Sequence, residues 1–351
     1  MALLAVGCTS ATVEPSTTTS PPQQPSTTAV APTTTIAPGT SSILATTSST
    51  LDPDELTIES FPVPPGSRPH DVAPAVDGGV WYTGQNRGVL GLLDPATGEV
   101  LEIPLGSGSR PHGVIVDEQG TPWITDGGLN AIVSVDPETL EVEVYPLPDS
   151  AANANLNTAV FDDVGTLWFT GQAGFHGVLD PATGEMTVYQ SPRGSGPYGI
   201  THTSQGKTVF ASLAGSYIGV IIEGGDVLAH EPPTPNQGAR RVWADSTGKV
   251  WVSEWNSGNV SRYDFSTDEW TTWHLPGEGP ATYAVYVDEN DIVWLSDFGA
   301  NAMVRFDPSS EEFTVYELPH DPGNVRQIHG RPGEVWGAES AADHLVLIRT
   351  R

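Results

Sequence analysis

The chain has very little cysteine and very little lysine. Among its 351 residues there is one Cys, Cys8, and there are two Lys, Lys207 and Lys249. A single Cys excludes a disulfide scaffold and a zinc cluster built from thiolates. Basic residues number 14 against 43 acidic ones, which gives a formal net charge of −29. Such a chain repels a polyanion, so we expect no nucleic-acid partner.

Long apolar runs are also lacking. No stretch approaches the roughly 18 residues that a membrane-spanning helix needs, so the sequence predicts no transmembrane segment. Turn-forming residues, by contrast, are abundant, with 38 Gly and 31 Pro. Glycine and proline interrupt helices and favour tight turns, which indicates many short strands rather than a helical bundle. The fold class that the composition predicts is therefore all-β.

The first fifty residues differ in composition from the rest. Two-thirds of residues 9–50 are Ser, Thr or Pro, and Glu14 is the only charged residue among them. Such a segment cannot bury enough apolar surface to become ordered, so residues 9–52 are predicted to be a disordered linker. The sequence Leu-Ala-Val-Gly-Cys that ends at Cys8 resembles the lipid-attachment motif of bacterial lipoproteins. We interpret residues 1–8 as the remnant of a lipoprotein signal, with a lipid on Cys8 as the only membrane contact of an extracytoplasmic, lipid-anchored or secreted protein.

From residue 53 onward the sequence repeats. Large aromatic residues recur 41–45 residues apart, at Trp81, Trp123, Trp168, Phe210, Trp251, Trp294 and Trp336. Around each of them lie four short stretches of alternating or apolar character, separated by turns rich in Asp, Gly and Pro. A unit of this length with four strands has the size of one blade of a β-propeller. We interpret the aromatic residues mainly as packing between blades.

The two ends of the repeated region are complementary. The last unit supplies only three strands before Arg351, and residues 57–63 read as a fourth strand without the three that should precede it. The simplest arrangement pairs residues 57–63 with the last unit, because ring closure hides the exposed strand edges. The sequence thus predicts a seven-bladed β-propeller over residues 53–351, with four-stranded blades and closure by an N-terminal strand. We expect it to be a monomer.

One face of the predicted ring gathers polar side chains. In each blade the start of the innermost strand and the end of the next strand lie on the same face, since the two form a hairpin. The seven pairs at these positions are His70 with Gly84, His112 with Asp126, Thr158 with Gly171, Tyr198 with Ser212, Arg241 with Glu254, Tyr283 with Asp297, and Arg326 or Gln327 with Glu339. Loops from every blade meet at the central face of a propeller, which makes this mouth the candidate ligand site.

Two recurring motifs resemble those of a known family. Arg-Pro-His-Gly stands at residues 110–113, and Trp-Ile-Thr-Asp and Trp-Val-Ser-Glu-Trp begin at Trp123 and Trp251. Together they make the repeat similar to that of the virginiamycin B lyase family, over about residues 55–351. The resemblance implies a seven-bladed propeller that linearises a cyclic depsipeptide antibiotic without water. It implies that a histidine removes a proton alpha to a carbonyl, that the ester oxygen leaves as a carboxylate, and that a Mg²⁺ held by glutamate assists.

Carried onto this chain, the resemblance assigns roles to individual mouth residues. The family's histidine, and the glutamate fourteen residues after it in the sixth blade, fall on Tyr283 and Asp297. His112 and Asp126 keep the same spacing in the second blade. We therefore take His112, Asp126 and Tyr283 as the candidate catalytic residues. The other candidates are His70, Tyr198 and Arg241 for substrate binding, and Glu254, Asp297 and Glu339 for Mg²⁺, which prefers oxygen ligands.

Two functions stay open at this point. The first is an extracytoplasmic binding module that holds a small-molecule or peptide ligand at its mouth. Tyr283 stands where the family has its base, and an ordinary tyrosine, with a pKa of about 10, is a poor general base. The second is a Mg²⁺-dependent carbon–oxygen lyase acting on a streptogramin B-type cyclic depsipeptide or a related lactone. We place binding first, because a fold alone does not carry a function.

Two other propeller enzymes fit the sequence less well. The calcium-dependent lactone hydrolases have six blades, whereas seven repeats are present here. A quinone-cofactor dehydrogenase is suggested by the repeated Asp-Pro-Ala-Thr-Gly-Glu turn at Asp94 and Asp180. Such enzymes usually have more blades, and the Trp of this chain follows a different strand. Both are therefore disfavoured.

Overall fold

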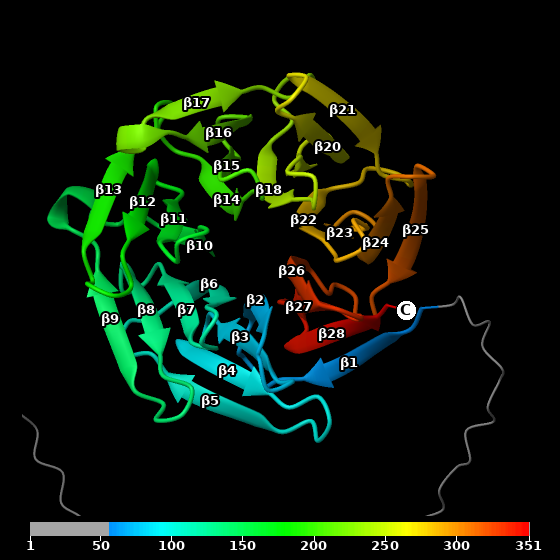
Figure 1. Cartoon of the computed structure of the whole chain (residues 1–351). Coiled ribbons are helices and arrows are strands. Elements are labelled where there is room, and N and C mark those ends of the chain that lie inside the picture. The colour runs from blue at the N-terminus through cyan, green and yellow to red at the C-terminus, as the bar shows by residue number, and fades with distance from the viewer. Residues whose placement is uncertain (1–55, 351) are drawn as a thin grey trace, which may run out of the picture. The chain divides into compact units, whose positions relative to one another are not determined.

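The structure, a computed structural model, describes residues 56–350. In this part of the chain 28 strands form seven sheets of four strands each. The sheets follow one another around a ring, and the first strand of each repeat lies nearest the centre (Figure 1). The prediction of an all-β, seven-bladed propeller is confirmed. Cys8 and the linker over residues 9–52 lie outside the described residues.

The blades are numbered in chain order, and their strands are given from the centre outward. Blade one contains β2 (Pro69–Pro74), β3 (Val80–Gly84), β4 (Val89–Leu93) and β5 (Val100–Pro104). Blade two contains β6 (Pro111–Val116), β7 (Pro122–Asp126), β8 (Ala131–Val135) and β9 (Val142–Pro146). Blade three contains β10 (Leu156–Phe161), β11 (Leu167–Gly171), β12 (Phe175–Leu179) and β13 (Met186–Gln190). Blade four contains β14 (Pro197–His202), β15 (Thr208–Ser212), β16 (Tyr217–Ile221) and β17 (Val227–His230).

The remaining three blades complete the ring. Blade five contains β18 (Ala239–Ala244), β19 (Val250–Glu254), β20 (Asn259–Asp264) and β21 (Glu269–His274). Blade six contains β22 (Thr282–Val287), β23 (Val293–Asp297), β24 (Ala302–Asp307) and β25 (Glu312–Glu317). Blade seven contains β26 (Val325–Arg331), β27 (Glu334–Glu339), β28 (His344–Arg349) and β1 (Ile58–Pro62). The helical segments of the described chain are two short 3₁₀ turns, Asp149–Ala151 and Glu223–Gly225. No helix among residues 56–350 is long and apolar enough to cross a membrane.

A recurring turn joins the two outer strands of several blades. In blade one its sequence is Asp-Pro-Ala-Thr-Gly-Glu, and the N–H of Ala96 donates to Asp94 Oδ1 at 2.8 Å. Gly98 has a φ of 76°, in the left-handed region that glycine adopts readily, and its N–H donates to the carbonyl of Asp94 at 2.8 Å. The Asp side chain and the glycine thus set the turn that returns the outer strand against its neighbour.

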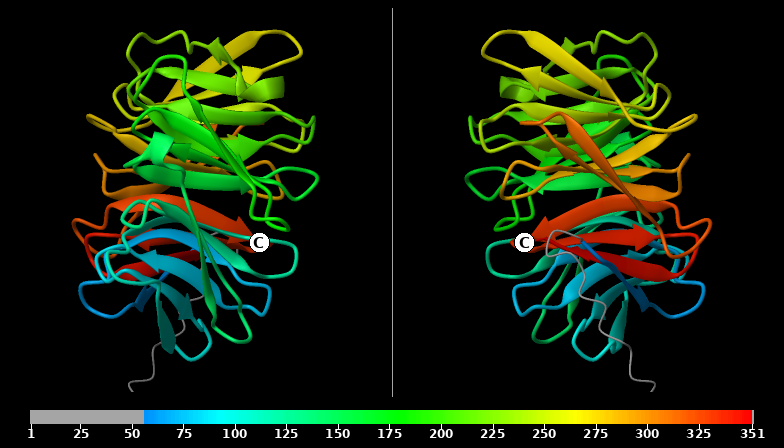
Figure 2. Two further views of the ribbon diagram at one scale, coloured as in Figure 1. Left: turned by 90° about the vertical axis from the view of Figure 1, so that its left-hand side faces the viewer. Right: turned by 90° about the vertical axis from the view of Figure 1, so that its right-hand side faces the viewer.

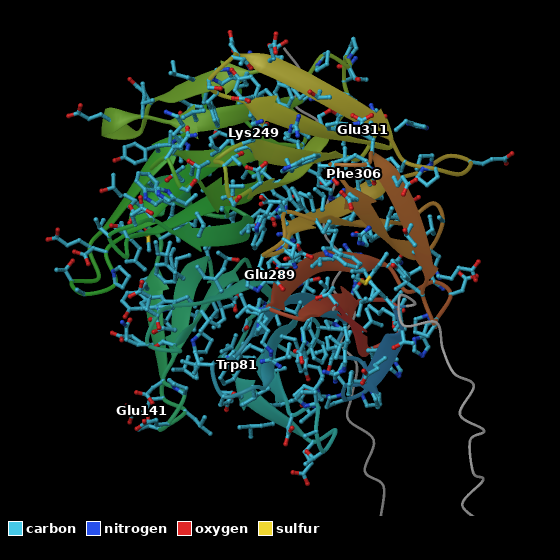
Figure 3. The ribbon with its side chains drawn as sticks, turned by 45° about the vertical axis from the view of Figure 1, so that its right-hand side comes forward. Trp81, Glu141, Lys249, Glu289, Phe306 and Glu311 are labelled. Atoms are coloured by element: carbon cyan, nitrogen blue, oxygen red, sulfur yellow. The ribbon has the colours of Figure 1, made fainter. Side chains whose placement is uncertain are left out.

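The periodic tryptophans pack between neighbouring blades, as predicted. Trp81 of blade one is 2% exposed and lies in one apolar cluster with Val114 of blade two. Trp81 and Phe306 are buried in the packed body, whereas the charged side chains of Glu141 and Glu311 are exposed at its periphery (Figure 3). The cores between blades, rather than one central core, therefore account for most of the apolar burial.

In four blades an aspartate accepts the hydrogen bond of the indole N–H, which makes burial of the indole compatible with its polar group. The indole N–H of Trp123 donates to Asp117 Oδ2 at 2.9 Å, from the turn that precedes the strand. The same contact with the Asp six residues earlier recurs at Trp168, Trp251 and Trp294. An indole N–H without an acceptor would be costly to bury, so these aspartates are part of the repeat's packing.

The N-terminal strand closes the ring. β1 pairs antiparallel with β28, with Ile58 opposite Ile348. Phe61 of β1 also packs on Trp336 of β27, with ring centroids 5.3 Å apart. Figure 1 shows β1 beside β28, and the side views of Figure 2 agree in placing the blue N-terminal strands against the red C-terminal ones. The predicted pairing of residues 57–63 with the last unit is confirmed.

Removal of β1 should strongly destabilise the propeller. A chain that begins at residue 64 exposes the edge of β28 and loses the contact of Phe61 with Trp336. We expect a melting temperature about 10 °C or more below that of a chain beginning at residue 53, since each kcal/mol lost shifts Tm by about 2–4 °C at this size. Differential scanning calorimetry measures the difference. Equal melting temperatures would show that β1 does not hold the ring closed.

Candidate functional site

Every inner strand begins with a β-bulge. In blade three Leu156 pairs with Gly171 and Ala159 pairs with Phe169. Between these two pairs the inner strand advances by three residues and its neighbour by two, so the inner strand contains one extra residue. Equivalent shifts occur at the start of the other six inner strands. A bulge leaves the extra residue outside the regular pairing and changes the direction in which the side chains beside it point. The two residues after the first paired position of each inner strand therefore form two successive layers around the channel.

We name these the mouth layer and the second layer. The mouth layer consists of His70, His112, Asn157, Tyr198, Arg240, Tyr283 and Arg326. The second layer consists of the residue after each of these: Asp71, Gly113, Thr158, Gly199, Arg241, Ala284 and Gln327. The sequence prediction grouped Thr158 and Arg241 with the mouth residues, whereas the bulge places them one layer deeper.

A hydroxyl group on the second strand fixes the bulged start of the inner strand. Thr125 Oγ1 accepts the N–H of Gly113 at 2.9 Å and donates to the carbonyl of Asn157, in the next blade, at 2.5 Å. The equivalent hydroxyl accepts the corresponding N–H in four other blades, at Thr83, Thr170, Ser253 and Ser296. Thr83, Thr170 and Ser253 also donate to a mouth-layer carbonyl of the next blade. These bridges satisfy backbone groups that the bulge leaves unpaired and join neighbouring blades.

The glycine after His112 is required by this bridge. A Cβ at Gly113 would lie 2.8 Å from the Thr125 hydroxyl oxygen and 2.7 Å from the carbonyl oxygen of Asn157. Both distances are shorter than a carbon atom tolerates, so a larger residue would displace the bridge. Packing therefore accounts for the glycine of the Pro-His-Gly motif.

A buried ion pair spans the second layer. Asp71 Oδ1 accepts from Arg241 Nη2 at 2.9 Å, and Asp71 Oδ2 accepts from Arg241 Nη1 at 3.2 Å. Only 5% of the Arg241 side chain and 2% of the Asp71 side chain are exposed. Arg241 Nη1 also donates to Thr158 Oγ1 at 2.7 Å, and His70 Nδ1 lies 2.7 Å from Asp71 Oδ1. The bidentate pair is thus locked by further hydrogen bonds, which a buried pair needs in order to offset its desolvation.

The imidazole rings of two histidines from adjacent blades lie in close, tilted contact next to this ion pair. The ring centroids of His70 and His112 are 3.7 Å apart. Burial lowers the pKa of both imidazoles well below 6.5, and the guanidinium of Arg326 lowers the pKa of His70 further. Both rings are therefore neutral at pH 7, so their close contact carries no charge repulsion. His112 Nε2 lies 3.2 Å from Asn157 Nδ2, in a position to accept its amide hydrogen.

A pair of tyrosines lies beside the histidines. The hydroxyl oxygens of Tyr198 and Tyr283 are 2.5 Å apart, and Arg240 Nη2 donates to Tyr198 at 3.0 Å. The guanidinium carbon of Arg240 lies 3.5 Å from the centroid of the Tyr283 ring, which is a cation–π contact. Arg326 Nη1 lies 3.5 Å from the Tyr283 hydroxyl. Blades four, five, six and seven thus contribute to one cluster.

The pKa values of the two tyrosines move in opposite directions. Burial raises the pKa of Tyr198 to about 12. Burial acts in the same direction on Tyr283, but the guanidinium groups of Arg240, Arg241 and Arg326 outweigh it and lower the pKa of Tyr283 below its usual value. Tyr198 is therefore the hydrogen-bond donor of the pair, and Tyr283 is the tyrosine on which a phenolate is favoured.

The acidic residues at the ends of the second strands bond to the loops of their own blades. Asp126 Oδ1 accepts three backbone N–H groups, and Asp126 Oδ2 accepts the hydroxyl of Ser109 at 2.5 Å. Asp297 Oδ1 accepts two backbone N–H groups. Glu254 Oε2 accepts the hydroxyl of Ser257, in the turn after its strand, at 2.6 Å. These carboxylates hold loops in place rather than forming a ring of free acids.

The structure does not bring together the expected catalytic pair or the expected metal ligands. The bonds of Asp126 go to its own loop, and those of His112 go to Asn157. Glu339 Oε2 bonds to His320 Nδ1 at 2.8 Å. Within residues 56–350, one group of three potential ligands has all its ligating atoms within 4.8 Å of one another, and it consists of His70, Asp71 and His112. Glu254, Asp297 and Glu339 form no such group.

The cluster of His70, Asp71 and His112 suits Mg²⁺ poorly. Two of its three donors are imidazole nitrogens, whereas Mg²⁺ takes oxygen ligands in octahedral geometry. Both oxygens of the third donor, Asp71, already accept hydrogen bonds from Arg241. The described residues therefore do not fit the Mg²⁺ that the family resemblance implies, and we derive no step through it.

Sequence reasoning placed several mouth residues correctly and missed others. His70, His112, Tyr198 and Tyr283 do meet at the mouth. Asp71, Asn157 and Arg240 were missed, although each is adjacent in sequence to a residue that was chosen. The distance along the chain to the Trp of each repeat could have identified two of them. Asn157 lies 11 residues before Trp168 and Arg240 lies 11 residues before Trp251, just as His70 lies 11 residues before Trp81.

These features define a class: a seven-bladed propeller with a buried histidine, tyrosine and arginine cluster at its central mouth. The sequence profile of the virginiamycin B lyase family matches residues 40–279, and the chain belongs to this family. No curated protein sequence matches the chain.

Solved structures share the same fold. The chain is similar to a selenomethionine-substituted virginiamycin B lyase from Staphylococcus aureus, with a TM-score of 0.78, 20% identity, and coverage of 85% of this chain and 100% of that one. A streptogramin B lyase structure gives a TM-score of 0.77 at 22% identity, covering 84% and 98% of the two chains. A catalytically inactive histidine-to-alanine variant of the S. aureus lyase, with quinupristin, gives 0.78 at 20% identity, with coverage of 85% and 100%. At such identities the likeness concerns the fold.

Loss of one bridging hydroxyl should lower the free energy of unfolding. Thr125→Val keeps the shape of the side chain but leaves the Gly113 N–H and the Asn157 carbonyl without their partner. We expect a loss of about 1–3 kcal/mol in urea denaturation. Thr187→Val, at an exposed position in β13, is the matched control and should change stability by less than about 0.5 kcal/mol. Equal effects of the two substitutions would contradict the bridging role.

Proposed function

We propose that this protein is a binding module that holds a carboxylate-bearing small molecule or peptide at the mouth of its channel. The observation that carries the proposal is a set of arginines without carboxylate partners at the mouth of an acidic protein. Five of the 14 basic residues belong to this region: Arg68, Arg110, Arg240, Arg241 and Arg326. Within residues 56–350, only Arg241 among these five forms a salt bridge.

The position of these arginines supports an anionic ligand. Arg240 and Arg326 belong to the mouth layer, and Arg68 and Arg110 directly precede the Pro-His sequences of blades one and two. The charge of Arg68 reaches His70, whose pKa it helps to lower. Guanidinium groups bind carboxylates in a bidentate manner, and strongly where water is excluded. An anion at the mouth would offset the charge that Arg240 and Arg326 leave uncompensated.

Aromatic side chains beside the arginines favour a ligand with an apolar group. Tyr283 stacks on Phe298 with ring centroids 4.8 Å apart, and Trp255 contacts both rings edge-on. Trp255 and Phe298 are half-buried, so part of each ring faces solvent. A carboxylate next to an aromatic ring would therefore meet both the arginines and this apolar surface.

Isothermal titration calorimetry with 2-naphthoate and with its neutral isostere, 2-naphthamide, tests the proposal. We expect the carboxylate to bind at least about tenfold more tightly than the amide, because a charged hydrogen-bond pair is lost in the amide. The double variant Arg240→Ala with Arg326→Ala should lose this preference. Arg262→Ala is the matched control, since Arg262 also lies over aromatic rings but on β20, outside the mouth layer. Equal binding of the two probes would overturn the proposal.

A carbon–oxygen lyase is a second candidate function. The observation that favours it is the environment of Tyr283, which occupies the register of the family's catalytic histidine and has its pKa lowered by three arginines. A phenolate at Tyr283 could remove a proton alpha to a carbonyl. The electron pair would form a carbon–carbon double bond to the β-carbon, and the ester group on that carbon would leave as a carboxylate. Arg240 and Arg326 would stabilise the charge that develops, as electrostatic catalysis requires.

Incubation of the full chain with quinupristin tests the lyase candidate. Chromatography with fragmentation mass spectrometry should show a linear product of unchanged mass, because elimination adds no water. The rate should rise with pH as Tyr283 loses its proton and should be insensitive to EDTA. Tyr283→Phe should abolish the product, whereas Tyr283→His should keep it with a pH profile shifted toward about 6.5. Intact antibiotic with the wild-type protein would rule out this activity and leave the binding proposal untouched.

The location of the propeller is part of the same proposal. A lipid on Cys8 would hold the protein on the outer side of the cytoplasmic membrane, with residues 9–52 as the tether. The support is the sequence around Cys8 and the Ser, Thr and Pro content of the segment that follows. A ligand at the mouth would then be an extracellular or periplasmic compound.

A further inference from the structure

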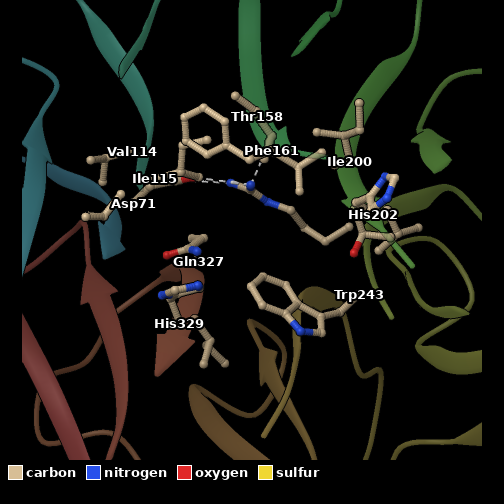
Figure 4. Close-up of a pocket in the computed structure, with 18 of the residues that line it drawn as sticks. Asp71, Val114, Ile115, Thr158, Phe161, Ile200, His202, Trp243, Gln327 and His329 are labelled. Atoms are coloured by element: carbon tan, nitrogen blue, oxygen red, sulfur yellow. Dashed lines mark hydrogen bonds and ion pairs between the residues drawn. The ribbon is translucent and has the colours of Figure 1, made fainter. Parts of the chain in front are cut away.

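A second cavity lies at the end of the channel opposite the mouth. Its volume is about 490 Å³, and residues from all seven inner strands line it. The mouth layer contributes none of its lining residues, whereas Asp71, Thr158, Arg241 and Gln327 of the second layer do. The Asp71–Arg241 ion pair therefore separates this cavity from the mouth. Figure 4 shows the cavity with Asp71 and Thr158 on one side and Trp243 and His329 facing them.

The walls of the cavity are apolar and partly aromatic. Ile115, Phe161 and Trp243 line it and are half-buried, so part of each side chain is open to solvent. The ring of Trp243 is held in place by an edge-on contact with Tyr286, with centroids 4.9 Å apart. A flat apolar ligand between Phe161 and Trp243 would remove this surface from water, which is the main source of affinity in such sites.

The second layer leaves one hydrogen-bond donor unused. Arg241 is 4% exposed, and its two terminal nitrogens bond to Asp71 and Thr158. Its Nε–H is buried without a partner. Asp71 already balances the charge of Arg241, so a second carboxylate here would be an uncompensated buried anion. A neutral acceptor such as a carbonyl oxygen would satisfy the Nε–H at no such cost.

An uncharged imidazole lies on the far side of the cavity. His329 Nδ1 is buried without a partner, and the ring stands edge-on to Trp243 with centroids 5.1 Å apart. Burial lowers the pKa of His329 to about 4, so the imidazole is neutral at pH 7. One further carboxylate lines the cavity, that of Asp117, and its oxygens already accept hydrogen bonds from Thr121 and Trp123. The cavity thus offers mainly apolar walls and unused neutral hydrogen-bonding groups, unlike the cationic mouth.

We propose that this cavity is a second binding site, for a neutral aromatic compound that carries a carbonyl group. The carbonyl oxygen accepts the Nε–H of Arg241, and the aromatic ring lies against Trp243 and Phe161. This site is independent of the function proposed for the mouth.

Titration of the full chain with prodan, 6-propionyl-2-(dimethylamino)naphthalene, tests the proposal. Prodan is neutral, has a ketone and an aromatic ring system, and emits at shorter wavelength with higher intensity in apolar surroundings. We expect saturable, blue-shifted emission with one molecule bound per chain. The analogue 2-dimethylaminonaphthalene, which lacks the ketone, should bind about tenfold more weakly in competition, because it leaves the Arg241 Nε–H unsatisfied.

Two matched variants locate the bound probe. Val160→Trp fills the cavity from β10 and should abolish the signal, whereas Val315→Trp, on the outer strand β25, should leave it unchanged. If Val160→Trp does not fold, as judged by its thermal melt, Val160→Asp places a charge in the same wall and should also weaken binding at least about tenfold. Unchanged binding in Arg240→Ala with Arg326→Ala supports the assignment. Three results would overturn the proposal. They are the absence of saturable prodan binding, equal affinity for the two probes, and a signal that is lost in the Arg240→Ala, Arg326→Ala variant but kept in the Val160 variants.

Discussion

The bulge at the start of each inner strand is the constraint on which the rest of the site depends. An extra residue in seven successive strands would leave backbone groups unpaired in the most crowded part of the ring. The hydroxyls of Thr83, Thr125, Thr170 and Ser253 satisfy such groups and at the same time join blades one, two, three and five to the blade that follows each of them. These bridges end on the carbonyls of His112, Asn157, Tyr198 and Tyr283, so the preceding blade helps to position these four mouth-layer residues.

The mouth is rich in positively charged arginines, whereas the molecule as a whole is strongly negative. A chain with a net charge of −29 gathers arginines around neutral histidines and a tyrosine pair. Its carboxylates at the same end of the blades are bonded to loops, as the contacts of Asp126 and Asp297 show. Burial strengthens the electrostatic effect of the arginines, and they favour the phenolate on Tyr283 over the one on Tyr198.

The central channel has two chemically different ends. Toward the mouth lie cations, hydroxyls and imidazoles, and toward the opposite face lie aliphatic and aromatic walls around Trp243 and His329. The ion pair of Asp71 with Arg241 lies between them, and Nε is the one nitrogen of the Arg241 guanidinium without a partner among the described residues. One buried pair therefore joins blades one and five across the channel and lies between two ends of different chemistry.

The sequence by itself determined the ring: the aromatic residues 41–45 positions apart, the Asp and Gly turns, and the orphan strand at residues 57–63. These are local or periodic signals, and each blade repeats the same packing, so the pattern is sufficient. Only the tertiary structure decided the composition of the mouth. A one-residue bulge selects Asn157 and Arg240 instead of Thr158 and Arg241. The hydrogen bonds of Asp126 go to loop residues and not to His112. Arg240 of blade five and Arg326 of blade seven both contact Tyr283 of blade six. This contact depends on how the blades pack against one another, and residue spacing along the chain does not predict it.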